Sequence, residues 1–89
     1  MSNTIQLKFP ITIDGTEYKE LTMRRSKIKD RLAVSKIKDK GDEEKEITLF
    51  ANLCDVTPSV MQELDEIDYA EIQKVYMSFF DSAGMSAAK

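Results

Sequence analysis

Apolar and polar residues alternate near the start of the chain. The apolar positions, one residue in two, are Ile5, Leu7, Phe9, Ile11 and Ile13. A period of two is typical of a β-strand with one buried face. Asp14 and Gly15 follow, and a glycine accepts the positive φ of a tight turn. The pattern therefore predicts a β-hairpin over about residues 5–24.

The register of this hairpin depends on which side chains face the core. A two-residue loop would set Phe9 and Leu7 opposite polar residues of the second strand. A three-residue loop with a bulge sets Phe9 opposite Leu21 and Leu7 opposite Met23, so that apolar side chains share one face. We therefore predict the three-residue loop, which places Tyr18 on the other face.

Beyond residue 25 the apolar spacing changes to three or four residues, as in amphipathic helices. We predict four short helices, over about residues 27–38, 43–54, 58–65 and 69–81. The fold class is α+β, an N-terminal β-hairpin followed by three to four short α-helices in a single small domain. That domain covers residues 1–81, and we expect residues 82–89 to form a flexible tail.

The first predicted helix has a weak apolar stripe. Ser26 is its candidate N-cap. Ile28 and Leu32 lie on one side of the helix, while Val34 and Ile37 lie on another.

Capping residues mark the start of the last two helices more clearly. Thr57 is placed to cap the third helix, with Pro58 at its first position. Asp68 is placed to cap the fourth, with Glu71 three residues later in a capping-box spacing.

The second and fourth helices carry broad apolar surfaces. In residues 43–54 the apolar arc covers roughly 200°. The last helix has a continuous apolar stripe from Tyr69 to Phe80. One neighbour cannot cover so wide an arc, so we expect the second helix to be central to the fold or buried in part by another subunit.

Composition and charge favour self-association. The chain has 89 residues, one cysteine and no histidine, so neither an internal disulfide nor a zinc site can support its small core. Residues 1–40 carry a net charge of +5 and residues 41–89 carry −8. Such asymmetry is typical of a protein that binds a charged partner or contacts its own copies head to tail. Two solvated faces of different charge would also produce it.

The sequence holds few groups that could support chemistry. It has no histidine, and Cys54 is expected to be buried without a base to activate it. The carboxylates lie where helix capping and solubility explain them. We therefore predict a protein that is not an enzyme and binds no metal or cofactor. The first ten residues lack the basic and apolar regions of a signal peptide, and no apolar run is long enough to span a membrane, so we expect the protein in the cytoplasm.

A basic stretch leaves one alternative function open. Residues 24–40 are rich in lysine and arginine, and such a segment can contact phosphates. A small nucleic-acid-binding regulatory protein is therefore the alternative. The pI of about 4.9 and the interleaved Asp30 and Asp39 count against it.

Three motifs resemble one known family. They are "IDGTEYKELTMRR", "NLCDVTPSVMQELDEIDY" and the aromatic final helix, and the resemblance covers about Ile5 to Phe80. In this order they are similar to the phage tail assembly chaperones of the Mu-like myophage type. Family members commonly read "LRRP" where this chain has "MRRS", so the start of the first helix is less fixed here.

The resemblance implies a non-enzymatic chaperone in the host bacterial cytoplasm. Such proteins bind the tape measure protein while the tail tube assembles around it, and they are absent from the finished virion. The tail tube protein is a second candidate partner, and a homo-oligomer is expected. The wide apolar arcs suit this role, although packing within the chain would also explain them.

Seven residues are candidates for contact with a partner. Five apolar side chains extend beyond the stripe that each helix needs for its own core, and two arginines could reach carboxylates at the rim. They are Leu49, Leu53, Met77, Phe79 and Phe80, with Arg24 and Arg25.

Overall fold

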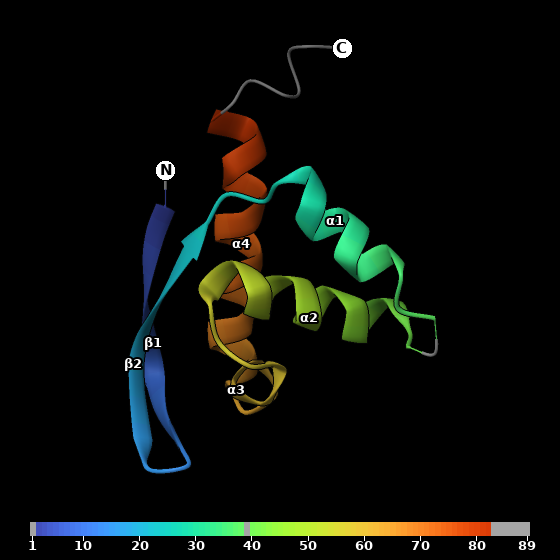
Figure 1. Ribbon diagram of the computed structural model, residues 1–89. Coiled ribbons are helices and arrows are strands. Elements are labelled where there is room, and N and C mark those ends of the chain that lie inside the picture. The colour runs from blue at the N-terminus through green and yellow to red at the C-terminus, as the bar shows by residue number, and fades with distance from the viewer. Residues whose placement is uncertain (1, 39, 83–89) are drawn as a thin grey trace.

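The computed structural model describes residues 2–38 and 40–82. A hairpin is followed by four helices: β1 (Ser2–Ile13), β2 (Thr16–Arg24), α1 (Ile28–Ser35), α2 (Asp42–Cys54), α3 (Pro58–Gln62) and α4 (Glu66–Ser82) (Figure 1). The predicted α+β class is confirmed. Of the tail predicted at 82–89, residues 83–89 lie outside the described part of the chain.

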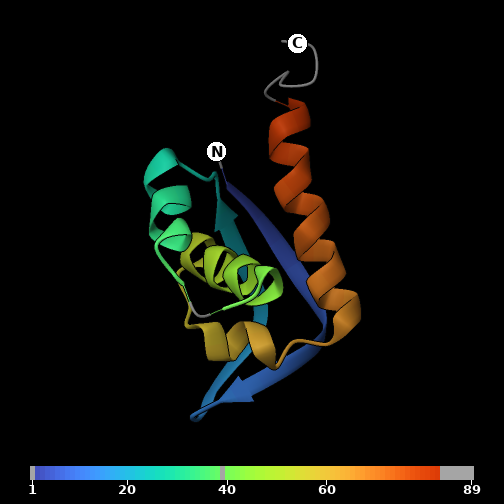
Figure 2. The same cartoon turned by 90° about the vertical axis from the view of Figure 1, so that its right-hand side faces the viewer.

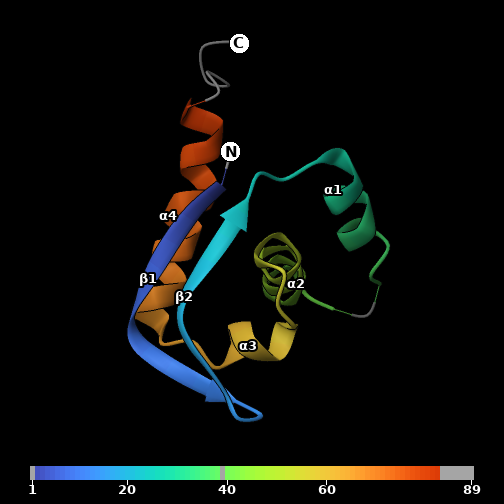
Figure 3. The same ribbon diagram turned by 60° about the vertical axis from the view of Figure 1, so that its left-hand side comes forward.

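The helices are arranged around one face of the hairpin. β1 packs against α4, and β2 packs against α2. α1 packs against α2 and lies on its outer side, away from the hairpin (Figure 3). A second view shows α2 between α1 and α4 (Figure 2). α2 therefore lies between the hairpin and α1, while α4 packs against the hairpin directly.

The hairpin turn contains two residues. Asp14 and Gly15 have φ of 50° and 84°, and Ile13 pairs with Thr16. Positive φ at both central positions defines a type I′ turn, whose twist matches that of the flanking strands. The predicted three-residue loop is therefore wrong.

The irregularity lies within β1 instead. Gln6 pairs with Glu20 and Ile11 with Tyr18, so four residues of β1, 7–10, lie opposite the single residue Lys19. Three extra residues in one strand form a special bulge, larger than the usual bulge of one extra residue. Tyr18, which pairs with Ile11, packs against the core, so its predicted place on the other face is wrong.

The bulge achieves what the longer loop was predicted to achieve. A shift by an odd number of residues reverses which face each side chain occupies. Leu21 therefore pairs with Ile5, and both are buried. The predicted pairs of Phe9 with Leu21 and Leu7 with Met23 are wrong, and Phe9 lies exposed.

A buried carboxylate from α4 holds this bulge. Asp68, only 1% exposed, accepts hydrogen bonds from the backbone N–H of Lys8 (2.8 Å, to Oδ1) and of Phe9 (3.0 Å, to Oδ2). Pro10, the next residue, has no N–H to satisfy. Backbone N–H groups that leave a strand ladder need another acceptor, and here the two oxygens of one carboxylate accept from two N–H groups.

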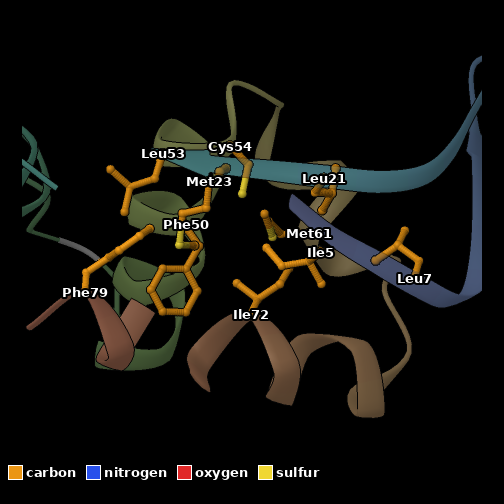
Figure 4. Close-up of a cluster of buried hydrophobic side chains, with 11 residues drawn as sticks. Ile5, Leu7, Leu21, Met23, Phe50, Leu53, Cys54, Met61, Ile72 and Phe79 are labelled. Carbon is orange, nitrogen blue, oxygen red and sulfur yellow. The ribbon is translucent and has the colours of Figure 1, made fainter. Parts of the chain in front are cut away.

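The core is one cluster of side chains from the hairpin, α2, α3 and α4 (Figure 4). Its members are Ile5, Leu7, Leu21, Met23, Phe50, Ala51, Leu53, Cys54, Met61, Ile72 and Phe79. The Phe50 ring centroid lies 5.7 Å from that of Tyr69 and 5.1 Å from that of Tyr76. The prediction that the second helix is central to the fold is confirmed.

Two of the predicted helix starts are wrong. Thr57 occupies the N-cap of α3 and Pro58 its first position, as predicted. The N-cap of α1 is Lys27 rather than Ser26. Helix α4 begins at Glu66, so Asp68 lies in its first turn, where its carboxylate binds β1 instead of capping the helix.

Candidate functional site

The two arginines that end the hairpin are engaged within the chain. Arg24 donates from Nη1 to Asp30 Oδ2 and from Nη2 to Asp30 Oδ1, both at 2.9 Å. This bidentate geometry is the strong form of an arginine–carboxylate pair. The pair joins the end of β2 to α1.

Asp30 also organises the start of α1. It is buried, and its Oδ2 accepts a hydrogen bond from the Lys27 backbone N–H at 2.8 Å. The hydrogen bonds from Arg24 lower the pKa of Asp30 to about 2, although burial opposes the shift. The same bonds raise the pKa of Arg24. Asp30 is therefore ionised wherever the protein is near neutral pH.

The buried carboxylate sets the direction in which α1 faces. Residues two positions apart in a helix lie about 160° apart around its axis. With Asp30 inward, Ile28 and Leu32 therefore point outward, and they are 65% and 54% exposed. Val34, one turn from Asp30, is half-buried. The Asp30 carboxylate, and not the stripe of larger apolar side chains, therefore determines which face of α1 is buried.

Arg25 connects the end of β2 to α4. Its Nη1 donates to the Phe79 backbone carbonyl at 2.9 Å. Its guanidinium carbon lies 5.5 Å from the centroid of the Phe79 ring, within the range of a cation–π contact. Both predicted rim arginines thus stabilise the junction of β2, α1 and α4.

The five apolar candidates occupy different environments. Leu53 and Phe79 are buried in the core cluster. Leu49 is half-buried against that cluster. Phe80 is half-buried, and its ring meets that of Tyr76 edge-on with 5.1 Å between the centroids. Met77 is 59% exposed. The structure therefore does not bring the five into one surface patch, and their role in partner binding stays a prediction.

An apolar surface that the sequence patterns did not indicate lies at α1. A groove of about 410 Å³ between the start of α1 and the end of α4 is lined by Ser26, Lys27, Ile28, Arg31 and Phe80. Periodicity alone shows that Ile28 and Leu32 share a face, but it cannot show that the face is outward. The signal that could have revealed this is Asp30, six residues after an arginine that ends a strand.

A second groove is acidic. It measures about 540 Å³ and is lined by Glu43, Glu46, Ile47, Glu66, Tyr69, Ala70 and Gln73. Tyr69 Oη donates to Glu46 Oε1 at 2.8 Å. Burial and this hydrogen bond raise the pKa of Tyr69. The charge asymmetry of the sequence is therefore also present on the folded surface.

The described residues hold little reactive chemistry. Cys54 is buried, and burial raises the pKa of its thiol to about 11, so the reactive thiolate is scarce near neutral pH. Within residues 2–38 and 40–82, no three His, Cys, Asp or Glu residues are grouped so that they could hold a metal ion. No helix in the same ranges is long and apolar enough to cross a membrane.

Comparison with known proteins agrees with the resemblance seen in the motifs. Residues 4–81 match the family described as "Phage tail assembly chaperone proteins, E, or 41 or 14". Comparisons with curated proteins and with solved structures gave no match. The matched range contains the junction at Arg24 and Arg25, the bulge held by Asp68 and almost all of α4. The chain belongs to the phage tail assembly chaperone family.

Proposed function

We propose that this chaperone binds the tape measure protein during assembly of the tail tube and leaves before the virion is complete. The observation that carries the proposal is the family match over residues 4–81. Five large apolar side chains exposed on the described surface are consistent with it: Phe9, Ile28, Leu32, Ile67 and Met77. Ile28 and Leu32 are neighbours on α1, and contiguous exposed apolar surface is typical of a site that binds another protein.

We further propose that the protein acts by binding alone, without catalysis. Of the five apolar residues predicted from the sequence, Leu49, Met77 and Phe80 have surface that a partner can reach. Leu53 and Phe79 support the fold from within the core, and the two arginines position α1 and α4. The proposal also includes a homo-oligomer, the tail tube protein as a second partner and a cytoplasmic location.

Co-expression with the tape measure protein of the same phage tests the proposal. We expect an affinity-tagged chaperone to retain the tape measure protein and keep it soluble. Mass spectrometry of purified virions should detect the tail tube protein but not the chaperone. Elution of the chaperone without the tape measure protein, or its presence in virions in amounts comparable to the structural proteins, would contradict it.

Sedimentation velocity of the purified chaperone tests the homo-oligomer. At micromolar concentration we expect a dimer or a larger species, because the surface carries both a basic and an acidic region. A single monomeric boundary would remove self-association from the proposal and leave tape measure binding untouched.

A further inference from the structure

The outer surface of α1 has the features of a docking site. We define the α1 face as Ile28, Leu32 and Phe80 together with Lys29 and Arg31. Ile28 and Leu32 are four residues apart, so they lie one above the other on the same side of the helix. They are among the most exposed large apolar residues of the described chain. Phe80 adjoins Ile28 across the groove between α1 and α4.

The ion pair between Arg24 and Asp30 keeps the α1 face turned toward solvent. α1 buries only one residue, Asp30, and Arg24 holds that residue at two points. Rotating α1 to bury Ile28 and Leu32 would pull Asp30 away from Arg24 and bring its charge toward solvent. Such a rotation would break both hydrogen bonds from Arg24 and the bond from the Lys27 backbone N–H, which are of the strong, charge-assisted kind. The ion pair therefore keeps the apolar side chains presented to solvent.

The charge around the α1 face indicates the chemistry of its occupant. Lys29 and Arg31 are exposed, and neither forms an ion pair with any residue in the described ranges. The one acidic residue of α1, Asp30, is buried and already paired. An apolar centre with an unpaired basic border is complementary to an apolar stripe flanked by carboxylates.

We propose that the α1 face binds an acidic amphipathic helix of a partner protein. A helix that lies in a groove presents apolar anchors at intervals of three and four residues, which matches the spacing of Ile28 and Leu32. This inference deepens the proposed function and rests on it for the partner's identity, the tape measure protein. Nucleic acid fits the face less well, because phosphates would not cover the apolar centre.

Two synthetic peptides test the chemistry of the site. Each has about 20 residues, so that a helix can form, with the same leucine stripe and either glutamate or lysine at the remaining positions. Fluorescence anisotropy at low salt should show the glutamate peptide binding about tenfold more tightly or better. The preference should shrink toward 1 M salt, where charges are screened beyond about 3 Å. Equal binding of both peptides would overturn the proposed acidic character.

Paired variants test the location. Ile28→Ser combined with Leu32→Ser should weaken binding of the glutamate peptide about tenfold. The matched control is Phe9→Ser with Ile67→Ser, which removes two equally exposed apolar side chains at the hairpin and the start of α4. Because all four side chains are exposed, we expect both variants to keep the wild-type melting temperature. Equal loss of binding in both variants, or none in the first, would overturn the assignment to α1.

A charge reversal tests the border of the face. Lys29→Glu combined with Arg31→Glu should invert the preference between the two peptides, whereas Lys19→Glu, on the hairpin, should not. An unchanged preference in the first variant would show that other residues select the charge.

The tape measure protein distinguishes a failure of this inference from a failure of the proposed function. If the Ile28→Ser, Leu32→Ser variant retains the tape measure protein as well as wild type does, the α1 face is not its site, although the function stands. If wild type does not retain it, the function fails, and the peptides still test the face. If the variant instead dissociates a wild-type oligomer and binds the peptide normally, a second copy is the occupant and the proposal is overturned.

Discussion

Helices α1 and α2 are held in the fold by different means. α2 buries four neutral residues, Phe50, Ala51, Leu53 and Cys54, whereas α1 buries a carboxylate. Apolar burial stabilises α2 in proportion to the area removed from water. An ion pair instead fixes the position of one side chain relative to another. It therefore determines which face of the helix points inward more than it increases the free energy of unfolding. The contrast shows how a small protein can have a firm core and still keep an apolar helix face outside it.

The largest effect should follow truncation within α2. Phe50→Ala removes a fully buried ring that contacts Tyr69 and Tyr76, and it should cost about 3–5 kcal/mol of unfolding free energy. Urea denaturation followed by circular dichroism measures this loss. Met77→Ala, on the exposed side of α4, is the control and should cost far less. A Phe50→Ala cost near that of the control would mean that α2 is not the centre of the core.

Asp68→Asn should have the next largest effect, at the hairpin. An asparagine can offer one carbonyl oxygen where two N–H groups now donate, so one backbone donor loses its partner at a cost of about 1–3 kcal/mol. Hydrogen exchange should quicken at the Lys8 or Phe9 amide. The exposed Glu71→Gln on the same helix should leave both amides unchanged. Unaltered exchange in Asp68→Asn would indicate that the bulge does not depend on this carboxylate.

Asp30→Asn should act locally. Loss of the charged pair should cost roughly 1–2 kcal/mol, because Arg24 is partly exposed and water can replace its partner. Amide exchange should quicken in α1 while the amides of α2 stay protected. Asp42→Asn, at the exposed start of α2, is the matched control. Equal loss of protection in both helices would show that α1 and α2 form one cooperative unit.

These variants show which parts of the structure the sequence could predict. Periodicity was sufficient for the hairpin, the four helices and the central place of α2, because apolar burial determines each of them. It predicted the wrong hairpin register, and it did not determine which face of α1 is buried. In both places the structure depends on a carboxylate. Asp68 accepts a hydrogen bond from a strand 60 residues away, and Asp30 pairs with Arg24. The spacing of apolar residues carries no information about hydrogen bonds to carboxylates, so it did not identify either contact.

The same reason explains the outcome for the candidate site. Arg24 and Arg25 were predicted to reach carboxylates of a partner protein. Within the chain, Arg24 bonds to Asp30 and Arg25 bonds to the Phe79 carbonyl. Leu53 and Phe79 were selected because their helices carry wide apolar arcs. The hairpin and neighbouring helices bury both, which a single helix considered alone does not reveal.

Acid should loosen α1 in a defined range of pH. The pKa of Asp30 is lowered from its ordinary 3.8 to about 2, so its ionised form stabilises the fold above about pH 4. That contribution is lost progressively as the pH falls from about 4 to about 2. NMR shifts of α1 amides should change across this range in wild type, and change less in Asp30→Asn. Identical titrations would show that other carboxylates control α1.

The smallest expected effect is on nucleic acid. Arg24 and Arg25 are occupied within the chain, so residues 24–40 offer fewer groups to phosphates than their composition suggests. At physiological salt we expect DNA binding no tighter than about 10 μM, weaker than typical specific complexes. Filter binding or anisotropy measures this. Nanomolar binding that falls steeply with salt and disappears in Arg24→Ala with Arg25→Ala would favour the regulatory alternative.

The contact between Asp68 and the bulge also has a consequence in time. The N–H groups of Lys8 and Phe9 leave the ribosome well before Asp68, which follows them by 60 and 59 residues. At about 5–20 residues per second, the interval is roughly 3–12 s. Throughout it these two strand groups lack the partner that completes the hairpin. Until the first turn of α4 has been synthesised, the hairpin of each nascent chain therefore lacks the contact that holds its bulge.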